Sequence, residues 1–208
     1  MNRAFRTIAY AFVTNILIVT HTTVVTAKEN KDHATAGTNN TSANMDAVGS
    51  ATPAEFRWSE NRKLTWDDFR GPVNATSEES AAATHCGIGF KTSAGPNGNP
   101  QVVVYNTFYT SRSWVRPDAD AKVSSVLAHE QGHFDLCEIY TRILRERMNH
   151  FSFNVPDVKT ALMAVYSQVQ QEYESRQEAY EQETIHGTNI SVQHKWQGVI
   201  TKELSTLN

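Results

Sequence analysis

The segment "LAHEQGHFDLCE", residues 127–138, decides how the rest of the chain is interpreted. It places His129 and His133 four residues apart, with Glu130 directly after the first histidine. On an α-helix, side chains four residues apart differ by about 40° around the axis and lie about one turn apart along it. The two imidazoles can therefore face one point in space, which is the basis of the His-Glu-x-x-His zinc motif.

The glutamate of this motif projects in a different direction from the histidines. Glu130 lies about 100° from His129 and about 60° from His133 around the helix, so its carboxylate can reach a water on the same metal without binding the metal. Zinc makes such a water acidic near neutral pH, and a glutamate can then take its proton. The sequence predicts His129 and His133 as ligands of Zn²⁺ and Glu130 as the catalytic base.

The alternative is that two ordinary histidines share an ordinary helix. Two features argue against it. Glu130 falls close to the centre of the apolar stripe of the helix, where a carboxylate without a partner is costly. Gly132 stands in the middle of the helix, where glycine costs about 1 kcal/mol relative to alanine, but where it permits the close approach of another element. Both features favour the metal site.

The residues around the motif predict a small sheet followed by two long helices. Segments 83–93 and 101–115 are rich in β-branched and aromatic residues and are predicted as strands. Apolar residues then recur every three or four positions over 121–148 and again over 156–184, and Gly187 marks the end of the second helix. We expect an α+β domain in which the two helices pack as a hairpin.

The N-terminal region has a different composition. Residues 1–27 combine Arg3 and Arg6 with an apolar stretch and small residues before position 28, which is typical of a secretory signal peptide. Residues 28–54 are polar and are predicted as a flexible linker, so the folded domain is expected over 55–208. We expect a secreted or periplasmic protein without stable membrane insertion after cleavage; retention of the apolar stretch as an anchor is the alternative.

Charge and cysteine content set further bounds. The chain has 19 basic and 22 acidic residues, a formal net charge of −3, and no basic cluster that would favour nucleic acid as a partner. Its two cysteines are Cys86 and Cys137. In an oxidising compartment such a pair can be bridged, and a pair of buried thiols is equally compatible with the sequence.

Two histidines leave a catalytic zinc site one protein ligand short. The motif helix cannot easily supply that ligand, so we expect it from the second helix or its end. His186 is favoured because it follows the helix and the adjacent Gly187 allows a tight bend. Glu183 is the next candidate. The remaining candidates are Glu172, Glu181, His85 and His194.

Three segments carry a resemblance to a known family: "VLAHEQGHFDLCEIY" (126–140), "LTWDDFRG" (64–71) and "YEQETIHG" (180–187), the last followed by Gln193 and Trp196. Together they resemble a family of predicted secreted bacterial zinc-dependent proteases that was long catalogued as a domain of unknown function. The resemblance covers about residues 56–200. It implies a zincin-type metallopeptidase fold with His129 and His133 as ligands and Glu130 as base. The family pattern has Tyr-Asp where this chain has Tyr180-Glu181.

The sequence thus predicts a zinc-dependent peptidase that acts on a peptide or protein substrate. The alternative is a non-catalytic, zinc-stabilised binding or assembly module of the cell envelope. The number of protein ligands separates the two, because a catalytic zinc usually has three and a structural zinc has four.

Overall fold

The computed structural model describes residues 54–74, 80–95, 100–118 and 121–207. The predicted signal peptide and all but the last residue of the predicted linker lie outside this part of the chain. Within it, no helix combines the length and the apolar character needed to cross a membrane.

The strands form two small antiparallel sheets. In the first, β4 (Pro100–Tyr109) lies between β1 (Glu55–Phe56) and β3 (Cys86–Ala94), and Cys86 is paired with Phe108 at one end and Ala94 with Pro100 at the other. The second sheet pairs β2 (Ala82–Ala83) with β5 (Trp114–Val115). These strands are the β part of the α+β fold.

The predicted strand over 101–115 is divided in two. β4 ends at Tyr109, whose carbonyl oxygen accepts hydrogen bonds from the backbone N–H groups of Arg112 (3.1 Å) and Ser113 (2.9 Å). This turn reverses the chain, so that Trp114 and Val115 pair with β2 in the other sheet. The β-branched and aromatic composition predicted extended backbone, but it did not reveal the turn.

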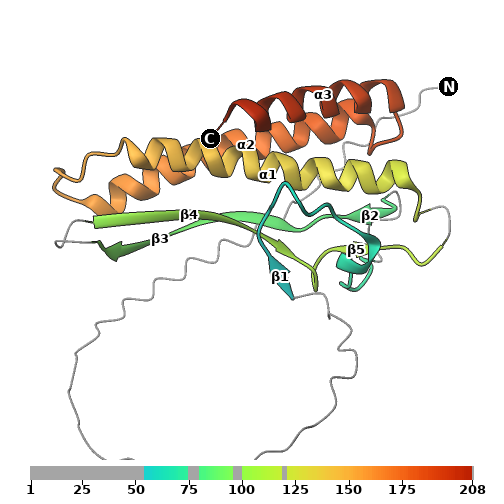
Figure 1. Ribbon diagram of the computed structural model, residues 1–208, viewed down its shortest axis with the longest axis horizontal. Coiled ribbons are helices and arrows are strands. Elements are labelled where there is room, and N and C mark those ends of the chain that lie inside the picture. Colours follow the sequence, from blue (N-terminus) through green and yellow to red (C-terminus); the bar gives the residue numbers. More distant parts are fainter. Residues whose placement is uncertain (1–53, 75–79, 96–99, 119–120, 208) are drawn as a thin grey trace, which may run out of the picture.

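The fold has three helices beside the first sheet in the described residues, one more than the sequence predicted. They are α1 (Ser124–Asn149), α2 (Val158–Thr184) and α3 (Ile190–Thr206). α1 packs on both β3 and β4, and α2 and α3 both pack on α1. Figure 1 shows α3 on the side of the helical layer that faces away from the sheet. The fold is therefore α+β, with small antiparallel sheets and three helices.

The core has two parts, and α1 contributes to both. Phe134 packs edge-on against Phe108 of β4, with ring centroids 5.2 Å apart, in the cluster between the sheet and the helices. The second cluster lies among the three helices and contains Leu136, Ile139, Tyr180, Trp196 and Ile200. Because α3 covers a second side of α1, the buried surface of this helix is wider than the single stripe predicted from its sequence.

A buried polar network links the sheet to the end of α3. Glu138 accepts hydrogen bonds from the side-chain amide of Asn106 and, at 2.7 Å, from Nε of Arg142. The same arginine donates through Nη1 to the carbonyl oxygens of Leu204 (2.8 Å) and Leu207 (2.6 Å). A basic group at the last carbonyls of a helix satisfies acceptors that the helix itself leaves unpaired.

The segment "LTWDDFRG" has a structural role in the loop beside the first sheet. Asp68 is buried and accepts from the backbone N–H of Thr65 (2.9 Å) and from the guanidinium of Arg62 (2.6 Å). Arg62 also lies over the ring of Phe56 in β1. These contacts fix the loop against the sheet.

Cys86 and Cys137 are free thiols in the structure. Cys86 begins β3 and Cys137 lies in α1, and a hydrogen bond between the two thiols lowers the pKa of Cys86, while burial raises the pKa of Cys137. Sγ of Cys86 also lies 3.4 Å from Oη of Tyr173. The sequence left open whether Cys86 and Cys137 form a disulfide or remain thiols. In the structure they are two free thiols in contact with each other.

The side chain of Tyr180 in α2 lies directly against Gly132 in α1, and this contact yields a testable prediction. A Cβ atom at this position would lie 2.2 Å from Oη of Tyr180, whose side chain is fully buried. We expect Gly132→Ala to lower the free energy of unfolding by about 1–3 kcal/mol, because the tyrosine has no space into which to move. Equilibrium denaturant unfolding measures this change.

Gly198 in α3 provides the matched control, because no atom lies within 4 Å of a Cβ placed there. Gly198→Ala should raise the free energy of unfolding by about 0.5–1 kcal/mol through helix propensity alone. Equal effects of the two substitutions would contradict the close packing at Gly132.

Candidate metal centre

Two helices bring three potential metal ligands together. His129 and His133 come from α1 and Glu181 from α2, and one ligand atom of each lies within 4.8 Å of the others. Oε2 of Glu181 is 2.9 Å from Nε2 of His129 and 3.1 Å from Nε2 of His133, and the two Nε2 atoms are 3.1 Å apart. We call these three residues the His-His-Glu cluster.

The packing of Tyr180 explains why Glu181 reaches the histidines. Tyr180 stacks on the ring of His129, with centroids 4.8 Å apart and planes 16° from parallel. Its hydroxyl donates to the carbonyl oxygen of His129 (3.0 Å), in the space that Gly132 leaves open. With Tyr180 fixed in the core, the next residue along α2 projects its carboxylate toward the cluster.

Gln177 determines which nitrogen of His133 carries the proton. Its Nε2 donates to the carbonyl oxygen of His133 (2.9 Å), a group that can only accept, so the orientation of the amide is fixed. Its Oε1 therefore faces Nδ1 of His133 at 2.6 Å. Nδ1 must donate, and in the neutral ring Nε2 presents a lone pair to the cluster.

Gln193 of α3 likewise determines which nitrogen of His129 carries the proton. Tyr180 uses its one hydroxyl hydrogen on the carbonyl oxygen of His129, so it must accept from Nε2 of Gln193, at 2.6 Å. Oε1 of Gln193 consequently faces Nδ1 of His129 at 3.0 Å. In their neutral forms both histidines would thus direct the lone pair of Nε2 at the carboxylate of Glu181. Three acceptors that converge on one point are stabilised by a proton or a metal cation among them.

In the metal-free protein a proton can fill that role. Burial by itself would lower the pKa of His133, but the hydrogen bond and the negative charge of Glu181 outweigh it and raise the pKa to about 9. Burial would likewise raise the pKa of Glu181, yet its hydrogen bonds to His129 and His133 hold it far below its usual range. The cluster is thus organised around positive charge.

Glu130 lies beside the cluster and has an unusual environment. It is 4% exposed, and among the described residues its Oε2 is the one buried side-chain polar atom without a hydrogen-bond partner. Its negative charge contributes to the raised pKa values of both His133 and Tyr180, and Glu130 directly follows His129 in α1. A buried acceptor without a partner costs about 1–3 kcal/mol, so this oxygen is suited to accept a hydrogen bond from a donor outside the chain, such as a water molecule.

His186, predicted as the third ligand, is not a member of the His-His-Glu cluster, whose third member is Glu181. Nδ1 of His186 is 2.5 Å from Oε1 of Glu181, the carboxylate oxygen that faces away from the histidine pair. His186 therefore contacts the third member of the cluster and orients it. The resemblance pointed to this position through the pair Tyr180-Glu181, but the flexibility of the helix end favoured the histidine.

A left-handed turn after α2 places His186 in this position. Ile185, His186 and Gly187 have φ angles of 50°, 54° and 77°. Such angles are rare for a β-branched residue and indicate that surrounding contacts hold the turn in place. Gly187 is packed so closely that a Cβ atom there would lie 2.8 Å from Cβ of His129. The turn therefore fixes His186 and His129 on opposite sides of Glu181.

The other candidate ligands have partners elsewhere or lie outside the cluster. Oε2 of Glu183 accepts from the indole of Trp196 at 2.9 Å, and Glu172 accepts from both terminal nitrogens of Arg147 at 2.9 and 2.8 Å. The two remaining histidines, His85 and His194, are not members of the cluster.

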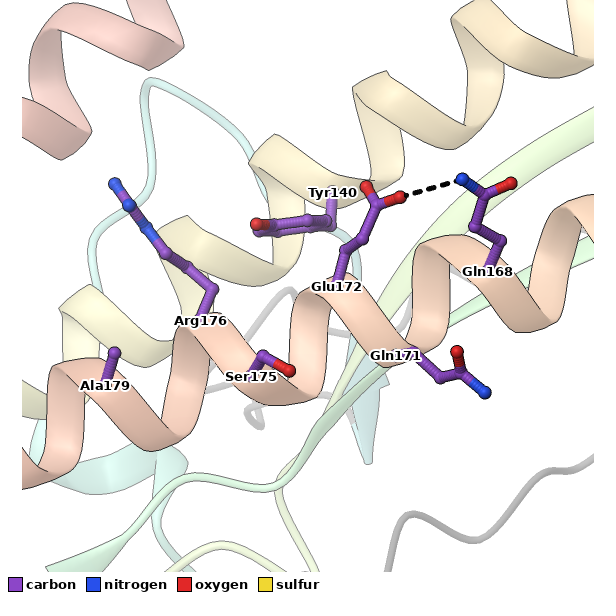
Figure 2. A pocket seen from close by; sticks show the side chains of 7 residues that line it. All are labelled: Tyr140, Gln168, Gln171, Glu172, Ser175, Arg176 and Ala179. Carbon is purple, nitrogen blue, oxygen red and sulfur yellow. Dashed lines mark hydrogen bonds between the residues drawn. The ribbon is translucent and has the colours of Figure 1, made fainter.

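A hollow between α1 and α2 lies away from this cluster. Its lining residues, shown in Figure 2, are Tyr140, Gln168, Gln171, Glu172, Ser175, Arg176 and Ala179. Its two charged residues pair with neighbours outside the hollow: Glu172 with Arg147 at 2.8 Å and Arg176 with Glu203 at 3.0 Å. The hollow has the character of a solvated helix surface.

Residues 67–187 match a family model described as "Bacterial protein of unknown function (DUF922)". The match spans more than half of the chain. This chain belongs to the DUF922 family. No curated protein and no solved structure matches the chain. All three members of the cluster lie within the DUF922 match, whereas α3, with Gln193, follows it.

The arrangement predicts different effects at Glu181 and His186. Removing a residue that only orients a ligand weakens metal binding by about 10–100-fold. Removing the ligand itself should weaken Zn²⁺ binding by more than that. We therefore expect Glu181→Ala to reduce Zn²⁺ affinity by more than His186→Ala, as measured by competition with a chromogenic chelator.

Glu183→Ala is the matched control, because this neighbouring carboxylate contacts Trp196 and not the cluster. Its Zn²⁺ affinity should equal that of the unmodified protein. A larger loss in His186→Ala than in Glu181→Ala would show that the histidine is the ligand.

Proposed function

We propose that this protein is a secreted or periplasmic zinc-dependent peptidase that hydrolyses bonds in peptide or protein substrates. The observation that carries the proposal is the unpartnered, buried carboxylate oxygen of Glu130 beside the His-His-Glu cluster. The sequence resemblance to predicted zinc-dependent proteases and the predicted signal peptide at residues 1–27 support the same activity and location.

The residues present fit a catalytic zinc ion. Two imidazoles with Nε2 lone pairs and one carboxylate form the ligand set of His₂Glu zinc hydrolases, in which a fourth position stays open for water and substrate. In the described part of the chain, no cysteine, third histidine or second acid belongs to the group. A structural zinc would need a fourth protein ligand, so the ligand count favours the peptidase over the zinc-stabilised module.

Zinc bound at this site would supply Lewis-acid activation of a water molecule and of the substrate carbonyl. Glu130 then accepts the proton of the attacking water at Oε2 and delivers it to the nitrogen of the leaving amine. Oε2 is free to accept this proton because, within the described structure, it has no competing hydrogen bond. His186 and Gln177 hold Glu181 and His133 in the orientation that the reaction needs.

A zincin-type fold is part of the proposal. Its support is the position of α1, which carries the His-Glu-x-x-His motif and packs along β3 and β4. α2 packs on α1 and brings Glu181 to the motif, as expected for the second arm of a helical hairpin.

Glu130→Gln tests the mechanism directly. Glutamine has nearly the same shape as glutamate but has no carboxylate to accept a proton. We expect Zn²⁺ content to stay at about one ion per chain while cleavage of denatured casein falls by about 100- to 10,000-fold. Elemental analysis and release of acid-soluble peptides measure the two quantities.

Glu146→Gln, at an exposed site on the same helix, is the control and should retain both zinc and activity. Full activity in zinc-loaded Glu130→Gln would contradict the base assignment. Absence of zinc from the unmodified protein, even after Zn²⁺ is supplied, would contradict the proposed function as a whole.

A further inference from the structure

α3 reaches the candidate metal centre although it follows the region that matches the family model. Its contribution is Gln193, which is 2% exposed and lies on the side of His129 opposite the cluster. Trp196, one turn further along α3, packs edge-on against Tyr180 with ring centroids 5.3 Å apart. Gln193 is thus held at a fixed distance from the histidine by a packed core.

The two nitrogens of His129 have competing partners. Nε2 faces Oε2 of Glu181 at 2.9 Å, and Nδ1 faces Oε1 of Gln193 at 3.0 Å. A neutral imidazole has one N–H, and a carboxylate attracts it more strongly than an amide oxygen does. Without Gln193, the proton would reside on Nε2, the atom that must coordinate the metal.

Gln193 can oppose this preference because its own orientation is fixed. The hydroxyl of Tyr180 accepts a hydrogen bond from Nε2 of Gln193 at 2.6 Å and donates one to the carbonyl oxygen of His129. Reversing the amide would place two acceptors against each other at Tyr180, because its hydroxyl hydrogen is already donated to His129. Oε1 is therefore held toward Nδ1, where a buried N–H without an acceptor would cost about 1–3 kcal/mol.

The position of α3 is fixed at both ends. At its start, the backbone N–H of Asn189 donates to the carbonyl oxygen of Thr184 at the end of α2, at 2.8 Å. At its end, Arg142 of α1 donates to the carbonyl oxygens of Leu204 and Leu207. The register of Gln193 relative to α1 is thus determined by contacts that do not involve the cluster.

We propose that Gln193 is a positioning residue of the metal centre: it keeps the proton of His129 on Nδ1 and so leaves Nε2 available to the metal. α3 is then an integral part of the site. This inference rests on the zinc binding proposed above, and it concerns affinity for the metal and not the chemical step.

The test compares Gln193→Leu with Gln193→Glu in the full chain. Leucine removes the acceptor, whereas glutamate keeps an oxygen that can accept from Nδ1. We expect Zn²⁺ affinity, measured by chelator competition, to fall about 10–100-fold in Gln193→Leu and to remain within a few-fold of the original in Gln193→Glu. The electronic spectrum of bound Co²⁺ should change in the leucine variant and be preserved in the glutamate variant.

Tyr180→Phe provides a second, independent measurement. It removes the hydroxyl that orients Gln193, so as a single substitution it should weaken Zn²⁺ binding. In the Gln193→Leu background it should have no further effect, because there is no amide left to orient. Gln197→Leu, a half-buried glutamine one turn along α3, is the control and should leave affinity unchanged.

The outcomes separate this inference from the proposed function. Equal Zn²⁺ affinity in the unmodified protein and in Gln193→Leu would overturn the role of Gln193 and leave the zinc site intact. Suppose that the leucine and glutamate variants lose Zn²⁺ affinity equally, and that these losses follow a lower thermal stability of the metal-free protein. Gln193 would then have a purely structural role, and the inference would also be overturned. Absence of Zn²⁺ binding in the unmodified protein would overturn both.

Discussion

The contact between Gly132 and Tyr180 is the constraint on which the site depends. A helix with any larger residue at position 132 would hold α2 further away, because the hydroxyl of Tyr180 occupies the place of the missing Cβ. The close approach allows Tyr180 to stack on His129 and to bond its backbone carbonyl. Glu181 follows directly, and its distance from both histidines is set by this packing. The glycine that weakens the isolated helix thus permits the assembly of the cluster.

The polar groups around this contact form one connected system. Gln177, Tyr180 and Gln193 each make two or more hydrogen bonds that involve the histidines or each other. Such a network is stabilising only when every member is satisfied, because an unpaired buried group costs more than a typical bond contributes. Within the described residues, Oε2 of Glu130 is the one buried side-chain polar atom without a hydrogen-bond partner, although the polar groups beside it are all paired.

The sequence revealed those features that depend on local periodicity. The α+β class, the two long helices and the pairing of His129 with His133 all follow from spacing along the chain. α3 was missed, although Gln193, Trp196 and Ile200 are buried at intervals of three and four, because polar and exposed residues separate them. Glu181 was ranked below His186 because the choice depends on how α2 packs and on a left-handed turn, neither of which a helical projection contains. The two-residue strands are similarly too short to leave a pattern.

The reliance of the cluster on α3 has a consequence for the order of events in synthesis. Glu181 is 52 residues from His129 along the chain, and Gln193 is 64 residues from it. A chain growing from the ribosome therefore exposes the histidine pair long before the groups that orient it are made. The pair alone has neither a third ligand nor a defined tautomer, so it would capture metal weakly at that stage. If the chain is exported before folding and binds zinc as proposed, it would acquire the metal at its destination, from the ions present there and not from those of the cytoplasm.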